Sequence, residues 1–288
     1  MRVKKVPVKK KAAEKKAPRK KSGSVWDRIE PLGVGLDDGI KINIYGRSAT
    51  GKTTLWATFP KPILAIICSG GKKAGELLSI NTPEYRKTIK KVVVHDSGEI
   101  EELVQMQEST EEFATVVLDH ASGLQGLVLK EILGLDNLPK QLSWGLATQQ
   151  QYGQLALRVK EHLSSLLDLS CNVVIVAQER EFNVENESEV ITPYVASALT
   201  PSIVGWLHPA CNYIAETFIR PKTVSKRIKV GKSTIDQEER VEGKVEYCLR
   251  VGPHDVYTTK FRVPKGRELP STIVDPSYKK IKALIDGK

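Results

Sequence analysis

A short glycine-rich segment carries the residues best suited to chemistry. Residues 46–53 read Gly-Arg-Ser-Ala-Thr-Gly-Lys-Thr, so a lysine and a threonine follow the second of two spaced glycines. Glycines at these places let the backbone curl until successive N–H groups point at one anion, at the start of a helix. The lysine adds a cation and the threonine a hydroxyl that can bind a metal ion. This pattern is typical of a loop that cradles the phosphates of a nucleoside triphosphate.

We therefore expect this loop to bind ATP with Mg²⁺. Lys52 would reach the β- and γ-phosphates, Thr53 would offer its hydroxyl to Mg²⁺, and Thr54 would touch the α-phosphate. We expect Lys52 to be exposed when the loop is empty. The predicted phosphate site consists of Gly46, Arg47, Ser48, Ala49, Thr50, Gly51, Lys52, Thr53 and Thr54.

A site of this kind needs a carboxylate at the end of a neighbouring strand, to hold Mg²⁺ through its water. Asp119 is the first choice, because it ends an unbroken apolar run at residues 116–118. Asp96, which lies just beyond another strand-like run, is the alternative. An aspartate at a strand end can also simply cap the next helix.

The segments that would position these residues alternate between apolar strands and longer helical stretches. The strand-like runs are residues 40–44, 62–68, 91–95, 114–119 and 172–178, and then 213–219, 245–251 and 257–263. The helical segments are residues 52–59, 121–133 and 142–169. Near-continuous Val, Ile and Leu in the first five runs predicts strands covered on both faces. The order favours an α/β fold with a largely parallel sheet and antiparallel strands at its C-terminal end, and residues 179–189 read as an exposed loop.

The basic charge is concentrated at the N-terminus. Residues 1–24 hold 11 basic residues and one acid, and the rest of the chain holds 33 of each sign. This stretch has little to bury, so we expect it to be disordered. It is a solubilising tail, a nuclear-import signal or an arm attracted to nucleic-acid phosphates. The expected parts are this tail, a lead-in at 25–38, one ATPase domain at 39–275 and a C-terminal tail or helix at 276–288.

The four cysteines have no Cys-x-x-Cys spacing, so neither a zinc site nor a disulfide framework is indicated. No apolar run approaches the roughly 20 residues of a membrane helix, and no secretory signal is visible. We therefore expect no membrane association and a cytoplasmic location, in a bacterium or a phage-infected host.

With the phosphate loop, Asp119 and a later strand that ends in Gln178, residues 36–275 resemble the core of RecA/RadA-type recombinase ATPases. More narrowly, they are similar to phage-encoded AAA-domain ATPases of the Sak single-strand annealing type. The resemblance implies a RecA-like fold, ATP hydrolysis, homo-oligomers in a ring or filament, and action on single-stranded DNA in recombination, replication or repair. It also implies that Gln178 contacts the γ-phosphate and leads into a DNA-binding loop, although the many glutamates of that loop suit phosphates poorly.

Two departures from the family pattern bear on hydrolysis. The recombinases have a catalytic glutamate just after the second strand, whereas this chain continues from Cys68 with Ser-Gly-Gly-Lys-Lys and reaches its next acid at Glu76. His120 stands where many AAA-type ATPases have a glutamate that polarises water. It could orient water or be a polar residue at a helix start. We expect slow hydrolysis, or help from Glu76 or a neighbouring subunit.

Further basic residues are candidates for phosphate contacts. Lys260 and Arg262 resemble the basic residue that RadA-type proteins insert into the next subunit's site, but they could equally be surface charge on an edge strand. A stretch without acids at residues 220–232 favours a phosphate-contacting hairpin or a solvated loop. The nucleic-acid candidates are Lys9, Lys10, Lys11, Arg220, Lys226, Arg227 and Lys229.

Two other functional classes stay open. A nucleotide-switched binding module with little hydrolysis would fit the missing glutamate after Cys68. A P-loop phosphotransferase would need an arginine-rich lid and an acceptor pocket, and neither is visible in the sequence.

Overall fold

The computed structural model describes residues 39–68, 75–135, 147–185, 191–230, 233–264 and 266–287. The expected tail and lead-in, including Lys9, Lys10 and Lys11, lie outside these ranges. The strands are β1 (Lys41–Gly46), β2 (Ile63–Ile67), β3 (Ile89–Val93), β4 (Thr115–Asp119), β5 (Asn172–Ala177), β6 (Glu179–Glu185), β7 (Ile191–Ser197), β8 (Tyr213–Val230), β9 (Ser233–Arg250), β10 (Lys260–Phe261) and β11 (Thr272–Val274). The helices are α1 (Lys52–Trp56), the 3-10 helix η2 (Gly75–Ile80), α2 (Pro83–Thr88), α3 (Gly98–Thr110), α4 (Ala121–Ile132), α5 (Gln149–Leu167), α6 (Pro201–Ala210) and α7 (Tyr278–Asp286).

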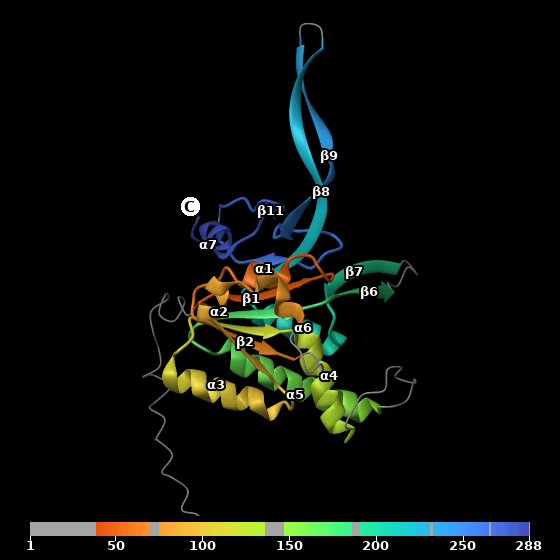
Figure 1. The fold of residues 1–288 in the computed structure, drawn as a ribbon. Coiled ribbons are helices and arrows are strands. Elements are labelled where there is room, and N and C mark those ends of the chain that lie inside the picture. The colour runs from red at the N-terminus through yellow and green to blue at the C-terminus, as the bar shows by residue number, and fades with distance from the viewer. Residues whose placement is uncertain are drawn as a thin grey trace, which may run out of the picture. The chain divides into compact units, whose positions relative to one another are not determined.

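One large sheet organises the described part of the chain (Figure 1). Its strand order is β11-β9-β8-β1-β5-β4-β2-β3, and β10 also pairs with β8. The run from β3 to β8 is parallel, whereas β9 and β10 pair with β8, and β11 with β9, in the antiparallel sense. The predicted α/β fold, with a mostly parallel sheet and antiparallel strands at its C-terminal end, is confirmed. Because the parallel strands point the same way, the residues that follow them gather at one edge.

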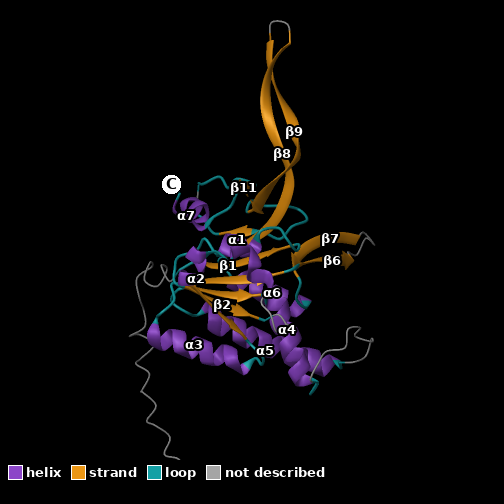
Figure 2. Cartoon of the chain, in the orientation of Figure 1, coloured by secondary structure: helices purple, strands orange, loops and turns teal. Residues whose placement is uncertain are grey.

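Helices cover both faces of the sheet (Figure 2). Ile44 of β1 packs in one core with Trp56 of α1 and Ile281 of α7. The next residue, Tyr45, points to the opposite core, which includes Leu163 of α5 and residues of α3, α4 and α6. Successive strand residues thus enter different cores, which is why these strands read as continuous apolar runs.

The segment expected as an exposed loop is a strand over residues 179–185. It forms β6 and pairs along its length with β7. Phe182 is buried and stacks on Tyr194 of β7, with ring centroids 5.1 Å apart. The expectation was wrong because charged residues flank Phe182 and make the alternation of polar and apolar residues in β6 short. The strand is stabilised by cross-strand pairs with β7, which comes later in the chain.

Helix boundaries also differ from the predicted ones. Helix α1 ends at Trp56 rather than at residue 59. Helix α5 begins at Gln149, because Thr148 and Gln151 form a capping box there. Of the helix expected at residues 142–169, residues 147 and 148 precede α5. Residues 142–146 lie outside the described residues.

The strands β8 and β9 are far longer than predicted and form a hairpin of 18 residues on each side. Near the body, β8 pairs with β1 and β10, and β9 pairs with β11. The two strands pair with each other from Glu216↔Arg250 to Val230↔Ser233, with an irregularity between Pro221 and Thr223 (Figure 1). The basic stretch at residues 220–232, expected as a phosphate-contacting hairpin or a solvated loop, lies in β8 of this hairpin up to residue 230. The side chains of Lys226, Arg227 and Lys229 are outside the described part of the structure.

Candidate functional site

The predicted phosphate loop joins the end of β1 to the start of α1. Gly46 has a φ of 152°, and a Cβ added there would lie 2.3 Å from the carbonyl oxygen of Thr217 on β8. Gly51 has a φ of 89° and stands at the N-cap of α1. The first glycine is required because a neighbouring backbone fills the space, and the second because side chains disfavour its conformation. The glycine spacing in the sequence thus corresponds to two constrained turns.

The Lys52 side chain folds back over the loop. Its Nζ donates hydrogen bonds to the carbonyl oxygens of Gly46, at 2.7 Å, and Arg47. Lys52 is 8% exposed, so the expectation of an exposed lysine was wrong. Burial lowers the pKa of Lys52 below its ordinary value, while the carboxylates of Asp119 and Glu179 act to raise it. A bound phosphate would add a further negative charge close to this ammonium. That charge would favour the protonated form of Lys52.

Thr50 fixes the middle of the loop. Its hydroxyl donates to the carbonyl oxygen of Arg47 at 2.8 Å and lies 2.7 Å from the Thr217 hydroxyl on β8. Thr50 is buried, whereas Arg47 and the next two loop residues are exposed. The loop is therefore anchored to the sheet by one side chain while the rest of it stays accessible.

A cavity of about 640 Å³ opens over this loop. Residues 48–55 line it, together with Asp119, His120 and Gln178, which lie at the ends of β4 and β5. Its volume lies within the range of about 300–1,000 Å³ that is usual for small-molecule sites. The loop and the two predicted strand ends thus face one space.

Asp119 is well placed to act with the loop. It is buried at the end of β4, and its Oδ2 accepts a hydrogen bond of 3.1 Å from Nε1 of Trp56 in α1. Asp96, the alternative, instead accepts from the backbone N–H groups of Gly98 and Glu99 at the start of α3. Asp96 is not among the residues that line the cavity. Of these two aspartates, Asp119 is the one that shares the cavity with the phosphate loop.

His120 and Gln178 occupy the predicted strand ends beside Asp119. His120 caps α4, since its Nδ1 accepts a 2.9 Å hydrogen bond from the Gly123 N–H. The carbonyl oxygen of Gln178 accepts from the Ala198 N–H at 2.7 Å, which fixes the backbone where β6 begins. Both residues line the cavity, so each can face a bound ligand.

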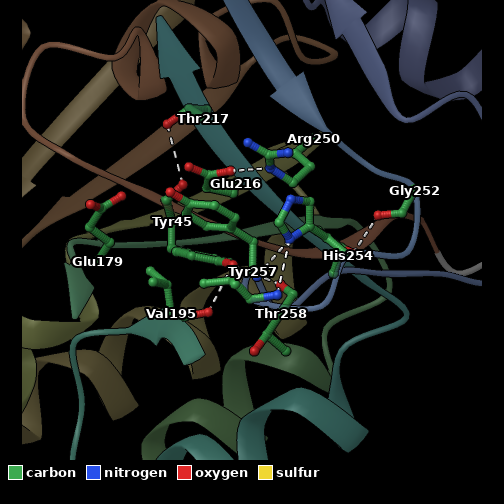
Figure 3. A network of polar contacts seen from close by, with 12 residues as sticks. Tyr45, Glu179, Val195, Glu216, Thr217, Arg250, Gly252, His254, Tyr257 and Thr258 are labelled. Carbon is green, nitrogen blue, oxygen red and sulfur yellow. Dashed lines mark hydrogen bonds and ion pairs between the residues drawn. The ribbon is translucent and has the colours of Figure 1, made fainter. Parts of the chain in front are cut away.

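Two interactions near the loop could not be predicted from the sequence. Nε of Arg47 lies 2.7 Å from Oε1 of Glu179, which links the phosphate loop to the start of β6. A partly buried ion pair of 2.6 Å joins Glu216 of β8 to Arg250 of β9 (Figure 3). Figure 3 places Glu179, Glu216 and Arg250 around Tyr45, the residue before the loop. These partners are more than 30 residues apart in sequence, so no local spacing could reveal them.

Tyr45 anchors the strand that leads into the loop. Its hydroxyl donates to the carbonyl oxygens of Thr258, at 2.9 Å, and Val195, at 3.2 Å. Burial raises the pKa of Tyr45, and the nearby Glu216 carboxylate raises it further. Tyr45 therefore stays protonated and acts as a fixed donor that ties β1 to the segment after β9 and to β7.

The remaining site candidates lie elsewhere. Glu76 is in η2, and its side chain is outside the described part of the structure. Lys260 donates through Nζ to three carbonyl oxygens, of His208, Pro209 and Cys211, near the end of α6. The Arg262 guanidinium donates to Asn212, and Arg220 is ion-paired with Glu246 on β9. The side chains of Lys260, Arg262 and Arg220 are not among those that line the cavity.

Two other kinds of feature are absent from the described residues. Within those ranges no cluster of three or more His, Cys, Asp or Glu could hold a metal ion. In that part of the chain no helix is both long and apolar enough to cross a membrane.

A phosphate loop after the first strand of a mostly parallel sheet, with an acid at the end of β4 and a glutamine after β5, is typical of a P-loop nucleotide-binding domain. The AAA domain family matches residues 38–263, which is most of the chain. This chain therefore belongs to the AAA domain family.

Two solved structures are similar to this chain over most of its length. One is the flagellar accessory protein FlaH from Methanocaldococcus jannaschii, at 12% identity and a TM-score of 0.40, with 83% of this chain and 87% of that chain covered. Another is the RadB recombinase, at 16% identity and a TM-score of 0.37, with 73% and 86% covered. No curated protein matches this chain.

Proposed function

We propose that this chain binds ATP with Mg²⁺, hydrolyses it slowly, and acts on single-stranded DNA in phage or prokaryotic recombination, replication or repair. The observation that carries the proposal is the single cavity that the phosphate loop shares with Asp119 and Gln178. A cavity with a cation, exposed loop backbone and a buried carboxylate suits a triphosphate with its metal ion better than a neutral metabolite.

Each of these groups has a distinct role in the proposal. The Lys52 ammonium neutralises the phosphates, and the Gln178 amide senses the γ-phosphate. The Thr53 hydroxyl is a hard oxygen donor, the type that Mg²⁺ takes, and the Asp119 carboxylate would hold the ion through one of its waters. One direct protein donor is enough, because Mg²⁺ usually keeps several waters and phosphate oxygens. The metal ion would supply neutralisation of charge on the phosphates.

The proposed slow hydrolysis follows from the acids near the cavity. The chain has no acid between Cys68 and Glu76, so no carboxylate directly follows β2. Glu179 lies beside the loop, but Arg47 occupies one of its oxygens. The same observation favours the second candidate function, a nucleotide-switched binding module that scarcely hydrolyses ATP.

Measuring ATP turnover with and without single-stranded DNA tests the proposal. We expect slow turnover that the DNA stimulates, because DNA would bind next to the γ-phosphate end, at β6 and β7. Tight ATP binding with no turnover in either condition would favour the binding module. Turnover that depends on a small phosphate acceptor, and not on DNA, would instead indicate a phosphotransferase.

The basic tail should contribute to DNA affinity mainly at low salt. Deleting residues 1–24 removes 11 basic residues, so counter-ion release on binding should fall. The slope of log affinity against log salt should become shallower by about 0.7 for each phosphate that the tail neutralises in the full chain. Fluorescence anisotropy with a labelled oligonucleotide between low and moderate salt measures this slope.

The matched control replaces only Lys9, Lys10 and Lys11 by Gln, which should give an intermediate slope. ATP affinity of the truncated protein should stay at the level of the full chain. An unchanged salt slope after the deletion would refute the role of the tail in DNA binding.

We also propose that copies assemble into a ring or filament in the cytoplasm. The support is the RecA-like family, in which a basic residue completes the site of the next subunit. Lys260 and Arg262 would serve this purpose if their hydrogen bonds near the end of α6 were exchanged on assembly. Light scattering with and without ATP would detect such an assembly.

A further inference from the structure

The lining of the cavity over the phosphate loop also includes residues from the C-terminal part of the chain. Besides the loop and the two strand ends, its lining includes Tyr247 of β9 and the adjacent residues Asp275 and Pro276, just before α7. We propose that these three residues form a nucleoside site, which takes the base and ribose of the nucleotide whose phosphates the loop holds. This inference rests on the proposed ATP binding and assigns the other half of that ligand.

Tyr247 provides an aromatic surface beside the loop. A Cβ added at Gly51 would lie 3.1 Å from Cδ1 of Tyr247, so the ring rests against the loop backbone itself. The residue is 45% exposed, although its ring is large and mostly apolar. A ring that is held at one side and open at the other can stack on a flat base, which would cover the exposed part.

The segment with Asp275 is fixed to Tyr247 through the backbone. The Asp275 N–H donates to the carbonyl oxygen of Tyr247 at 2.8 Å, and Asp275 has a φ of 46°, in the left-handed region. Helix α7 follows and packs through Ile281 into the same core as Leu55 of α1. The Tyr278 N–H also donates to Thr58 Oγ1 at 2.8 Å, just after α1. The segment that follows Asp275 is thus attached to α1 and the residues just after it, and α1 is the helix that begins at the phosphate loop.

Charge decides which part of a nucleotide these residues face. The Asp275 carboxylate is exposed and would repel phosphates, so it does not suit the phosphate end. It suits the N–H and O–H donors of a base or a ribose, which need an acceptor. Pro276 adds an apolar surface next to it. The exposed Asp275 carboxylate therefore suits the uncharged half of a nucleotide better than its phosphates.

The volume of the cavity supports the same assignment. At about 640 Å³ it exceeds what a phosphate chain alone would need, since complete drug-sized ligands fill sites of about 300–1,000 Å³. The lining outside the phosphate loop and the two strand ends includes Tyr247, Asp275 and Pro276.

The test compares two ligands, Mg·ATP and Mg·tripolyphosphate, by calorimetry on the full chain. Tyr247→Ala should weaken ATP binding about 5–100-fold, because one base–aromatic stack is removed, and should leave tripolyphosphate binding within about twofold. Tyr247→Phe keeps the ring and should bind both ligands like the original protein. Val245→Ala is the matched control, since it removes an exposed apolar side chain two residues away on β9 that does not line the cavity.

Asp275→Asn gives a second, independent measurement. Loss of the carboxylate should weaken ATP binding and leave tripolyphosphate binding unchanged. A stronger affinity for tripolyphosphate in this variant would place Asp275 beside the phosphates and overturn its assignment.

Two results would overturn the nucleoside site as a whole. Equal losses for ATP and tripolyphosphate in Tyr247→Ala would mean that the ring only supports the loop, and no loss for either would mean that the base lies elsewhere. If the unaltered chain bound neither ligand, the proposed ATP binding itself would fail, so the two failures are distinguishable. Thermal melting of every variant shows whether the fold is intact.

Discussion

Lys52→Ala should abolish ATP binding in the micromolar range. The side chain carries the ammonium of the phosphate loop, and each hydrogen bond to a charged group contributes about 1.5–3 kcal/mol. Removing two such hydrogen bonds, to the β- and γ-phosphates, corresponds to a drop in affinity of about 10²–10⁴-fold. Calorimetry with Mg·ATP measures the change directly.

The fold should survive this substitution with a small decrease in stability. Lys52 is buried, and its Nζ holds the carbonyl oxygens of Gly46 and Arg47, so the empty loop should become less ordered. The core residues beneath it belong to β1 and α1 and are unchanged. Near-native melting with no ATP binding is therefore the expected combination.

Lys90→Ala is the control for loss of a positive charge. Lys90 lies on β3 at the far edge of the sheet, where its Nζ pairs with Glu112 on the surface. ATP affinity should not change in this variant. If Lys52→Ala also kept its ATP affinity, the phosphate loop would be misassigned and the whole proposed function would fall.

The phosphate loop was predictable because its information is local. The two glycines, Lys52 and Thr53 lie within eight consecutive residues, and each has a backbone or charge requirement that the sequence displays. Predicting that Asp119 and Gln178 lie near the loop needed one further inference. Parallel strands end at the same edge of a sheet, so residues at the ends of β4 and β5 must approach each other. The fold class followed from the same apolar runs.

Interactions between distant segments were not predictable from one sequence. Nothing around Tyr247 or Asp275 signals that β9 and the residues before α7 reach the loop, nearly 200 residues or more from Gly51. The pairing of Arg47 with Glu179 spans 132 residues. The burial of Lys52 also depends on how the loop closes over its own side chain. Such features depend on tertiary packing, which overrides local patterns.

Asp119→Asn should separate metal binding from nucleotide binding. The amide keeps the size of the side chain and can still accept the hydrogen bond from Trp56, so the structure at the end of β4 should persist. The negative charge, however, is removed. Groups that support a bound metal ion typically contribute about 10–100-fold to metal affinity or activity, and we expect a loss of that size in Mg²⁺ dependence and ATP turnover.

ATP binding without Mg²⁺ should be equal or stronger in this variant, because a carboxylate near the phosphates is removed. A Mg²⁺ titration of ATP affinity and turnover measures both effects. Asp96→Asn is the matched control: it follows β3, caps the start of α3 and does not line the cavity. If Asp96→Asn lost the Mg²⁺ dependence while Asp119→Asn kept it, the metal would belong to the end of β3, which β2 separates from β4.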